Sequence, residues 1–151
     1  MLTQRVRDQY VQTWHDNLTS QPKMEYYCKF KQDFVFEEYL ACVKNDNHRK
    51  ELSRFRLSSH SLEIETGRYN NISRENRKCN LCSQNTVESE YHFLLCCTVY
   101  SELRNKYCIK YNWPNMAKFK YLMLVKREKS LQNLAKYVYS AMKLRQEKLE
   151  V

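Results

Sequence analysis

A single glycine, Gly67, and only two prolines, Pro22 and Pro114, occur in this chain of 151 residues. Average usage of roughly 7% glycine and 5% proline predicts about ten and about seven. A Walker loop needs two glycines and a dinucleotide-binding fingerprint needs three, so the sequence contains neither nucleotide-binding motif. Architectures of many β-hairpins also favour glycine at their turns. Because glycine and proline are the residues that most destabilise helix interiors, the composition predicts an all-α fold.

Apolar residues recur at helical spacing near both ends of the chain. An N-terminal amphipathic helix that stops before Pro22 is predicted by Leu2, Val6, Tyr10, Val11, Trp14 and Leu18. A C-terminal helix is predicted by Leu131, Leu134, Ala135, Val138, Met142 and Leu149. Between them the pattern predicts a helix over residues 37–43 and another that is capped by Asp46 or Asn47. Residues 64–78, which include Gly67, predict a loop.

The chain has the length of one compact domain, and no internal repeat or low-complexity segment marks a boundary within it. We therefore expect residues 1–151 to form a single helical domain. Its parts are N-terminal helices over 1–62, a metal-binding knuckle with its ligand helix over 63–102, and basic helices over 103–151.

Residues 91–101 form the longest uncharged stretch, which is far shorter than the roughly 20 apolar residues that span a bilayer. No membrane partner is therefore expected. The first seven residues contain two arginines and no apolar run of a secretory signal. Together with an odd count of seven cysteines, this predicts an intracellular, reducing environment.

Cysteine and histidine residues in the middle of the chain have the spacing of a metal site. Cys79 and Cys82 are three residues apart, His92 follows after nine residues, and Cys96 and Cys97 are adjacent. Two thiolates on a tight knuckle and two further ligands from a helix complete a tetrahedron around Zn²⁺. On an unbroken helix Cys96 shares a face with His92, whereas Cys97 is rotated by roughly 140°. Cys97 is therefore a ligand only if the helix breaks before the two cysteines.

Further stretches accompany this motif: residues 55–68 (FRLSSHSLEIETGR), residues 87–97 (VESEYHFLLCC) and residues 100–104 (YSELR). With the Cys79-x2-Cys82 pair, they resemble the C-terminal zinc-binding region of reverse transcriptases from non-LTR (LINE-type) retrotransposons of animals. Residues 4–14 look like the entry helix of that family, and residues 134–145 look like its closing segment. The resemblance covers most of the chain.

The resemblance implies which cysteine is the fourth ligand. In that family the last ligand follows the histidine after four residues and precedes a proline, which carries the role onto Cys97. Thr98 replaces the proline here. A proline at that place suits the first position of a new helix, so the family pattern implies a helix break. The expected ligands of a structural Zn²⁺ are Cys79, Cys82, His92 and Cys97, with Cys96 as the alternative. His60 lies in the matching stretch, but a lone histidine after a helix end more often caps or packs.

Catalytic residues of the parent enzymes are missing. Reverse-transcriptase chemistry needs paired aspartates for two metal ions, and the chain has no Asp-Asp pair and too little length for a polymerase palm. No endonuclease constellation is recognisable. We therefore expect a non-catalytic accessory module without a small-molecule substrate, or an inert truncated copy. The resemblance implies the polymerase part of a parent polyprotein as a partner, and a nuclear location.

The net charge of +9 is unevenly distributed and favours an acidic partner. Residues 79–102 carry −3, whereas residues 44–78 carry +4 and residues 103–151 carry +9. RNA or DNA is the expected partner. The candidate contacts are Arg54, Arg56, Arg68, Arg74, Arg77, Lys78, Lys118, Lys120, Lys126 and Arg127. Lys129, Lys136, Lys143 and Arg145 extend the C-terminal set.

Aromatic residues are interleaved with the C-terminal cations: Tyr111, Trp113, Phe119, Tyr121, Tyr137 and Tyr139. Exposed rings stack on unpaired bases, although most rings in an apolar helix face pack in a core. The alternative function is a protein-interaction or packing module. In that hypothesis the N-terminal helix, with Tyr10 and Trp14, exposes an apolar patch to a partner.

Overall fold

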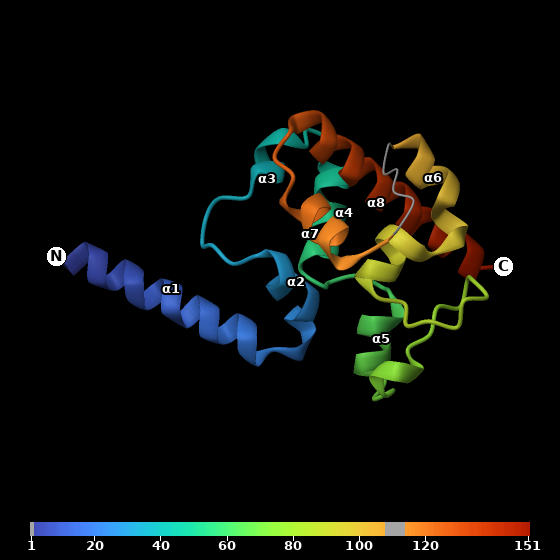
Figure 1. The fold of residues 1–151 in the computed structure, drawn as a ribbon, viewed down its shortest axis with the longest axis horizontal. Helices are drawn as coiled ribbons and strands as arrows, with labels where there is room; N and C mark the ends of the chain where they lie inside the picture. Colours follow the sequence, from blue (N-terminus) through green and yellow to red (C-terminus); the bar gives the residue numbers. More distant parts are fainter. Residues whose placement is uncertain (1, 108–113) are drawn as a thin grey trace.

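The computed structural model of the protein describes residues 2–107 and 114–151, and these are mostly helical (Figure 1). The elements are α1 (Leu2–Ser20), η1 (Pro22–Met24), α2 (Glu25–Phe30), α3 (Glu38–Cys42), α4 (Asp46–Arg56), α5 (Glu63–Tyr69), η2 (Arg74–Asn76), η3 (His92–Cys96), η4 (Thr98–Tyr100), α6 (Ser101–Lys106), α7 (Met116–Leu124) and α8 (Glu128–Leu149). Within the described ranges the β-type pairing is limited to an isolated antiparallel bridge between Lys78 and Val87. The predicted all-α fold is therefore confirmed.

The long helix α8 is the centre of the packing. Helices α3, α4 and α6 contact it, while α7 packs on α2. The inward face of α8 is buried and carries Leu131, Leu134, Ala135, Val138 and Ala141. The helix predicted from apolar spacing near the C-terminus is thus confirmed, and its apolar face packs in the core except at Leu149, which is 45% exposed. None of the helices in the described ranges combines the length and the hydropathy that crossing a bilayer requires.

Helix α1 extends away from the rest of the protein in Figure 1. Trp14 and Leu18 are half-buried against the core, whereas Val6 and Tyr10 are 63% and 62% exposed. The rings of Tyr10 and Trp14 each lie 5.3 Å from the ring of Phe34. The predicted amphipathic helix is present, but the first half of its apolar face remains in solvent.

Helices α3 and α4 occur where the sequence predicts them, but the predicted cap of α4 is wrong. The cap is Asn45, whose side-chain oxygen accepts a hydrogen bond from the backbone N–H of His48 at 3.1 Å. An amide oxygen at this position satisfies one of the N–H groups that a helix start leaves free. The expected caps, Asp46 and Asn47, therefore lie inside the first turn.

The loop predicted over residues 64–78 is wrong for its first half, where α5 spans Glu63–Tyr69. Gly67 lies inside this helix, and a Cβ at its position would be 2.5 Å from Cγ of Arg77. Arg77 crosses the helix there and donates hydrogen bonds to the carbonyls of Ile64 at 3.0 Å and Ile72 at 2.9 Å. The only glycine of the chain therefore permits close packing of a side chain on a helix.

Substitution Gly67→Ala tests this packing. Alanine favours a helix interior by about 1 kcal/mol, but its methyl group must displace Cγ of Arg77, which lies near the backbone and cannot swing away. We expect a net loss of about 1–2 kcal/mol in the free energy of unfolding from overpacking, measured by urea denaturation. In an Arg77→Ala background the same change should raise stability. An equal loss in both backgrounds would contradict the contact.

Candidate metal centre

Residues 77–88 form a short hairpin that presents the first two cysteines. The backbone N–H of Cys79 donates to the carbonyl of Thr86 at 2.9 Å, next to the isolated bridge that joins the two arms. Near the turn, Asn85 adopts a positive φ of 52°, a region that asparagine tolerates better than most residues. Cys79 and Cys82 therefore lie close together on a tight knuckle, as the sequence predicts.

The other two donors come from the π-helical turn η3 and its end. The backbone N–H of Cys97 donates to the carbonyl of His92, five residues back, at 2.8 Å. A turn closed over five residues is wider than an α-helical turn, so Cys97 returns to the side on which His92 lies. The backbone of Cys97 is then extended, with φ −59° and ψ 123°, and η4 begins at Thr98.

This turn separates the two cysteines between which the spacing alone does not choose. The thiol of Cys97 belongs to a cluster with the other expected ligands, and the thiol of Cys96 does not. Cys96 is half-buried near Tyr91, and burial raises the pKa of its thiol. A helix break is present, as a ligand role for Cys97 requires, but it lies at Cys97 and not before Cys96. The π turn already brings Cys97 to the side of His92, so no earlier break is needed.

Four donor atoms, the sulfurs of Cys79, Cys82 and Cys97 and a ring nitrogen of His92, lie within 4.8 Å of one another. The Cys82 sulfur is 3.4 Å from Nε2 of His92. A tetrahedral site with bonds of about 2.0–2.3 Å separates its ligand atoms by roughly 3.3–3.8 Å, so the cluster has the dimensions of a metal site. All but the half-buried Cys82 are buried. The cluster can hold a metal ion.

The ring of His92 is oriented by a hydroxyl group. Its Nδ1 lies 3.1 Å from Oγ1 of Thr86, and its Nε2 faces the sulfur of Cys82. A metal-binding histidine uses one nitrogen for the metal and donates the proton on the other to such a partner, which fixes its tautomer. Thr86 is not among the site residues predicted from the sequence, because a threonine in a hairpin has no spacing pattern that marks it.

Two of the thiols share a hydrogen bond that moves their pKa values apart. Contact with Cys97, then with His92 and with nearby backbone N–H groups, lowers the pKa of the Cys79 thiol against the opposing effect of burial. The contact with Cys79, together with burial, raises the pKa of the Cys97 thiol. The thiolate is the form of cysteine that binds a metal ion, so a cation bound at these sulfurs would displace the protons that they still carry.

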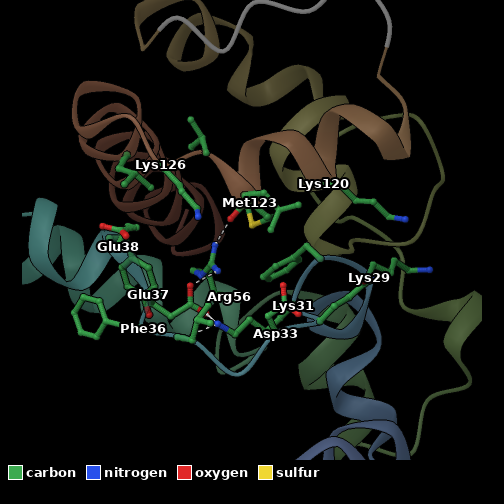
Figure 2. Close-up of a pocket in the computed structure, with 17 residues that line it drawn as sticks. Lys29, Lys31, Asp33, Phe36, Glu37, Glu38, Arg56, Lys120, Met123 and Lys126 are labelled. Atoms are coloured by element: carbon green, nitrogen blue, oxygen red, sulfur yellow. Dashed lines mark hydrogen bonds and ion pairs between the residues drawn. The ribbon is translucent and has the colours of Figure 1, made fainter.

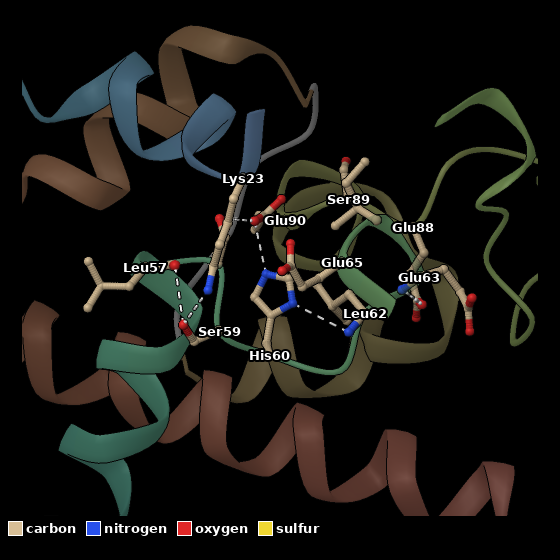
Figure 3. A network of polar contacts seen from close by, with 12 residues as sticks. Lys23, Leu57, Ser59, His60, Leu62, Glu63, Glu65, Glu88, Ser89 and Glu90 are labelled. Carbon is tan, nitrogen blue, oxygen red and sulfur yellow. Dashed lines mark hydrogen bonds and ion pairs between the residues drawn. The ribbon is translucent and has the colours of Figure 1, made fainter. Parts of the chain in front are cut away.

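His60 belongs to a separate polar network (Figure 3). Its Nδ1 accepts a hydrogen bond from the backbone N–H of Leu62 at 3.4 Å, so Nε2 carries the proton and donates to Oε1 of Glu90 at 2.9 Å. The hydroxyl of Ser58 donates to the same oxygen at 2.7 Å. His60 therefore holds the segment that leads into His92, and it is not part of the donor cluster.

Arg145, which the sequence groups with the C-terminal basic surface, is buried. Its Nε and Nη2 donate to the two carboxylate oxygens of Glu88, each at 2.8 Å. The backbone N–H of Glu63 donates to the same carboxylate at 2.8 Å. Arg145 is 5% and Glu88 1% exposed. The expectation of a surface cation is wrong, because Arg145 instead joins α8 to the arm of the hairpin.

Side chains also satisfy carbonyl groups at η3. The hydroxyl of Tyr137, which is fully buried on α8, donates to the carbonyl of Phe93 at 2.7 Å, and Arg104 donates to that of Cys97. Tyr137 is thus a packing residue and not a base-stacking one. Among the other aromatic candidates, Phe119 is buried, Tyr139 is half-buried and Tyr121 is exposed. Tyr111 and Trp113 lie outside the described residues.

Arg56, predicted to contact nucleic acid, is also buried. Its Nη1 donates to the carbonyl of Met123 at 2.6 Å, and its Nη2 donates to Glu37 at 2.9 Å. Its guanidinium carbon lies 4.7 Å from the centre of the Phe30 ring and 5.0 Å from that of Tyr39. The prediction of a surface contact is therefore wrong, because the Arg56 side chain is buried and links α4 to α7.

The remaining basic residues before and around the knuckle are engaged within the protein. Arg54, Arg68 and Arg74 form ion pairs with Glu51, Glu65 and Glu25, respectively. Arg77 and Lys78 are half-buried and donate to backbone carbonyls. The predicted positive surface beside the first cysteines is therefore largely compensated.

Basic residues around the α7–α8 junction differ from these. Over residues 118–129 the chain has five cations and one acid. Lys118 is half-buried on α7, whereas Lys120, Lys126, Arg127 and Lys129 are exposed. We name these four exposed residues the α7–α8 basic cluster. Of the ten candidate contacts, it keeps Lys120, Lys126 and Arg127 at the surface.

Comparison of the chain with protein-family models, with curated proteins and with solved structures finds no match.

Replacing each of the adjacent cysteines in turn tests the donor set. Cys97→Ser removes a donor, so the purified protein should lose its bound metal and the order of residues 77–97. Cys96→Ser is the matched control and should keep one equivalent, because that thiol lies outside the cluster. Metal content by elemental analysis checks both. Metal retained by Cys97→Ser and lost by Cys96→Ser would reverse the assignment.

Thr86→Val tests the orientation of the imidazole. The valine keeps the side-chain volume and removes the acceptor of the Nδ1 proton, so the affinity for a metal ion should fall about 10- to 100-fold. Competition with a chromophoric chelator measures this affinity. Thr98→Val, at an exposed position outside the donor cluster, should leave it unchanged. Equal metal affinities of the Thr86→Val and Thr98→Val variants would contradict a role of Thr86 in orienting His92.

Proposed function

We propose that the protein is a zinc-stabilised, non-catalytic module that binds nucleic acid. The observation that carries the metal part is the cluster of three cysteine sulfurs and one histidine nitrogen within 4.8 Å. This donor set is typical of structural Zn²⁺ sites. Four protein donors leave no open coordination position for water or substrate, which favours a structural role over a hydrolytic one.

Zinc held by Cys79, Cys82, His92 and Cys97 would cross-link the hairpin to η3. A structural zinc contributes on the order of 10 kcal/mol to the folding of small modules. Phe93, in the middle of η3, packs on the ring of Tyr137 on α8 at 5.9 Å. The metal therefore stabilises the contact of the knuckle with the same long helix at whose start the α7–α8 basic cluster lies.

The α7–α8 basic cluster supports nucleic acid as the partner. Its four cations are exposed, and within the described residues no ion pair engages them. Neutralising phosphates releases condensed counterions, which is the main source of affinity for nucleic acid. Tyr121, beside Lys120, is 61% exposed and offers a ring for stacking on an unpaired base.

The resemblance to retrotransposon reverse transcriptases supports a proposal about origin and place of action. In this proposal the module is the C-terminal part of such a polyprotein, its partner within the polyprotein is the polymerase part, and it acts in the nucleus. The donor pattern and its matching flanks carry this proposal.

A second candidate function is protein interaction, and it is favoured by one surface. The uncovered half of α1 exposes Val6 and Tyr10, and the neighbouring segment exposes Phe34, Val35 and Phe36. Contiguous apolar surface of this kind marks interaction sites in many proteins.

Binding of labelled RNA and DNA to the zinc-loaded protein tests the proposal. Fluorescence anisotropy should show an affinity that falls steeply between 50 and 200 mM salt. The double variant Lys126→Gln/Arg127→Gln should bind more weakly and lower the salt slope by about 0.7–0.9 for each lost phosphate contact. The matched control is Lys50→Gln/Lys148→Gln, at exposed positions that are not among the candidate contacts.

If the control variant loses as much affinity as Lys126→Gln/Arg127→Gln, the effect comes from the overall charge. That outcome would contradict binding at the α7–α8 basic cluster. Absence of binding at 50 mM salt would overturn the nucleic-acid function. Concentration-dependent self-association of that protein, abolished by Val6→Asp, would then support the second candidate.

A further inference from the structure

A pocket of about 410 Å³ lies between the segment that joins α2 to α3 and the α7–α8 junction (Figure 2). This volume is within the range of pockets that enclose small ligands. Cations and acids both line it: Lys29, Lys31, Arg56, Lys120 and Lys126, against Asp33, Glu37 and Glu38. The excess of positive charge favours an anionic ligand.

Two of these cations are built into the pocket wall. Arg56 is 5% exposed and Lys31 is 9% exposed. Both contact one carboxylate, that of Glu37, at 2.9 Å. Two buried cations thus share one half-buried carboxylate, and among the described residues Nε of Arg56 has no hydrogen-bond partner. A buried positive charge that is only partly compensated attracts an anion to the pocket.

Three lysines surround this wall from two different parts of the chain. Lys29 comes from α2, whereas Lys120 and Lys126 belong to the α7–α8 basic cluster. In Figure 2 the chains of Lys29 and Lys120 extend toward one end of the view, and the ammonium of Lys126 points toward Arg56. The acids Asp33 and Glu38 are exposed at the rim. The pocket therefore continues the α7–α8 basic cluster onto α2.

Most of the other lining residues are apolar, and one of them is an exposed ring. Met123, Leu124 and Val125 line the pocket, and so does Phe36, whose side chain is 68% exposed. An exposed aromatic ring next to lysines is the combination that single-stranded nucleic acid prefers, since the ring stacks on a base while the ammonium groups contact phosphates.

We propose that this pocket binds a short single strand, with an unstacked base on Phe36, a phosphate near Lys126, and a following phosphate near Lys29 and Lys120, which lie at the end of the pocket opposite Phe36 (Figure 2). The inference rests on the proposed nucleic-acid-binding function and assigns a place to it. A base within a duplex is stacked and paired on both sides, so it cannot enter a pocket of this size. The pocket accordingly selects single strands over duplexes.

The test compares a fluorescein-labelled 12-residue oligothymidylate with a 12-base-pair duplex, both with zinc-loaded protein. Phe36→Ala should weaken binding to the single strand about tenfold, because it removes a stacking ring, and leave binding to the duplex unchanged. Tyr69→Ala is the matched control: Tyr69 is also 68% exposed, and it lies on α5, away from the pocket.

Lys29→Gln provides a second variant outside the α7–α8 basic cluster. It should lower the salt slope of single-strand binding by about 0.7, whereas Lys50→Gln, an exposed position on α4 that does not line the pocket, should not. Wild-type protein that binds neither probe overturns the proposed function together with the pocket. Wild-type protein that binds both probes equally, with no effect of Phe36→Ala, overturns the pocket alone. If a polyglutamate peptide displaces the oligonucleotide and Phe36→Ala has no effect on binding, the pocket would instead bind acidic protein segments.

Discussion

The carboxylate of Glu88 links the hairpin of the candidate metal centre to the helical core through hydrogen bonds. Both of its oxygens accept from the guanidinium of Arg145, and the backbone N–H of Glu63 supplies a further hydrogen bond. Removing one partner of such a buried pair leaves an uncompensated charge and typically costs about 3–5 kcal/mol. Three separate parts of the chain, α5, the hairpin and α8, meet at this group, so the hairpin cannot shift independently of the long helix.

Local sequence patterns predict much of this structure. The features that they fail to predict depend on pairs of residues that are far apart in the sequence. The periodicity of α1 and α8 and the spacing of Cys79 and Cys82 from His92 are local, so the sequence identifies them. Arg74 pairs with Glu25 across 49 positions, and Arg145 pairs with Glu88 across 57. No short pattern reveals such partners. The π turn is likewise hidden, because a helical pattern does not show which hydrogen bond closes its last turn.

The net charge of the chain consequently differs from the charge that a partner meets. Arg56 and Arg145 are inside, and several other arginines face their own acids. Four exposed cations remain close together in the sequence where α7 leads into α8, beside a pocket whose wall contains two buried cations. In the proposed function, charge near this junction, rather than the overall excess of nine, is the quantity that we expect to attract a polyanion.

The π turn at His92–Cys96 has a consequence for the order of folding. The four donors of the candidate metal centre lie within residues 79–97, yet the carbonyl of Phe93 in this turn accepts a hydrogen bond from Tyr137, 44 positions further along. Closing a loop of that length costs conformational entropy before the contact forms. During synthesis the four donors leave the ribosome before α8, the helix whose contact with Phe93 helps to set their geometry. We therefore expect uptake of a metal ion by these donors to follow the docking of α8 as well as the formation of the hairpin.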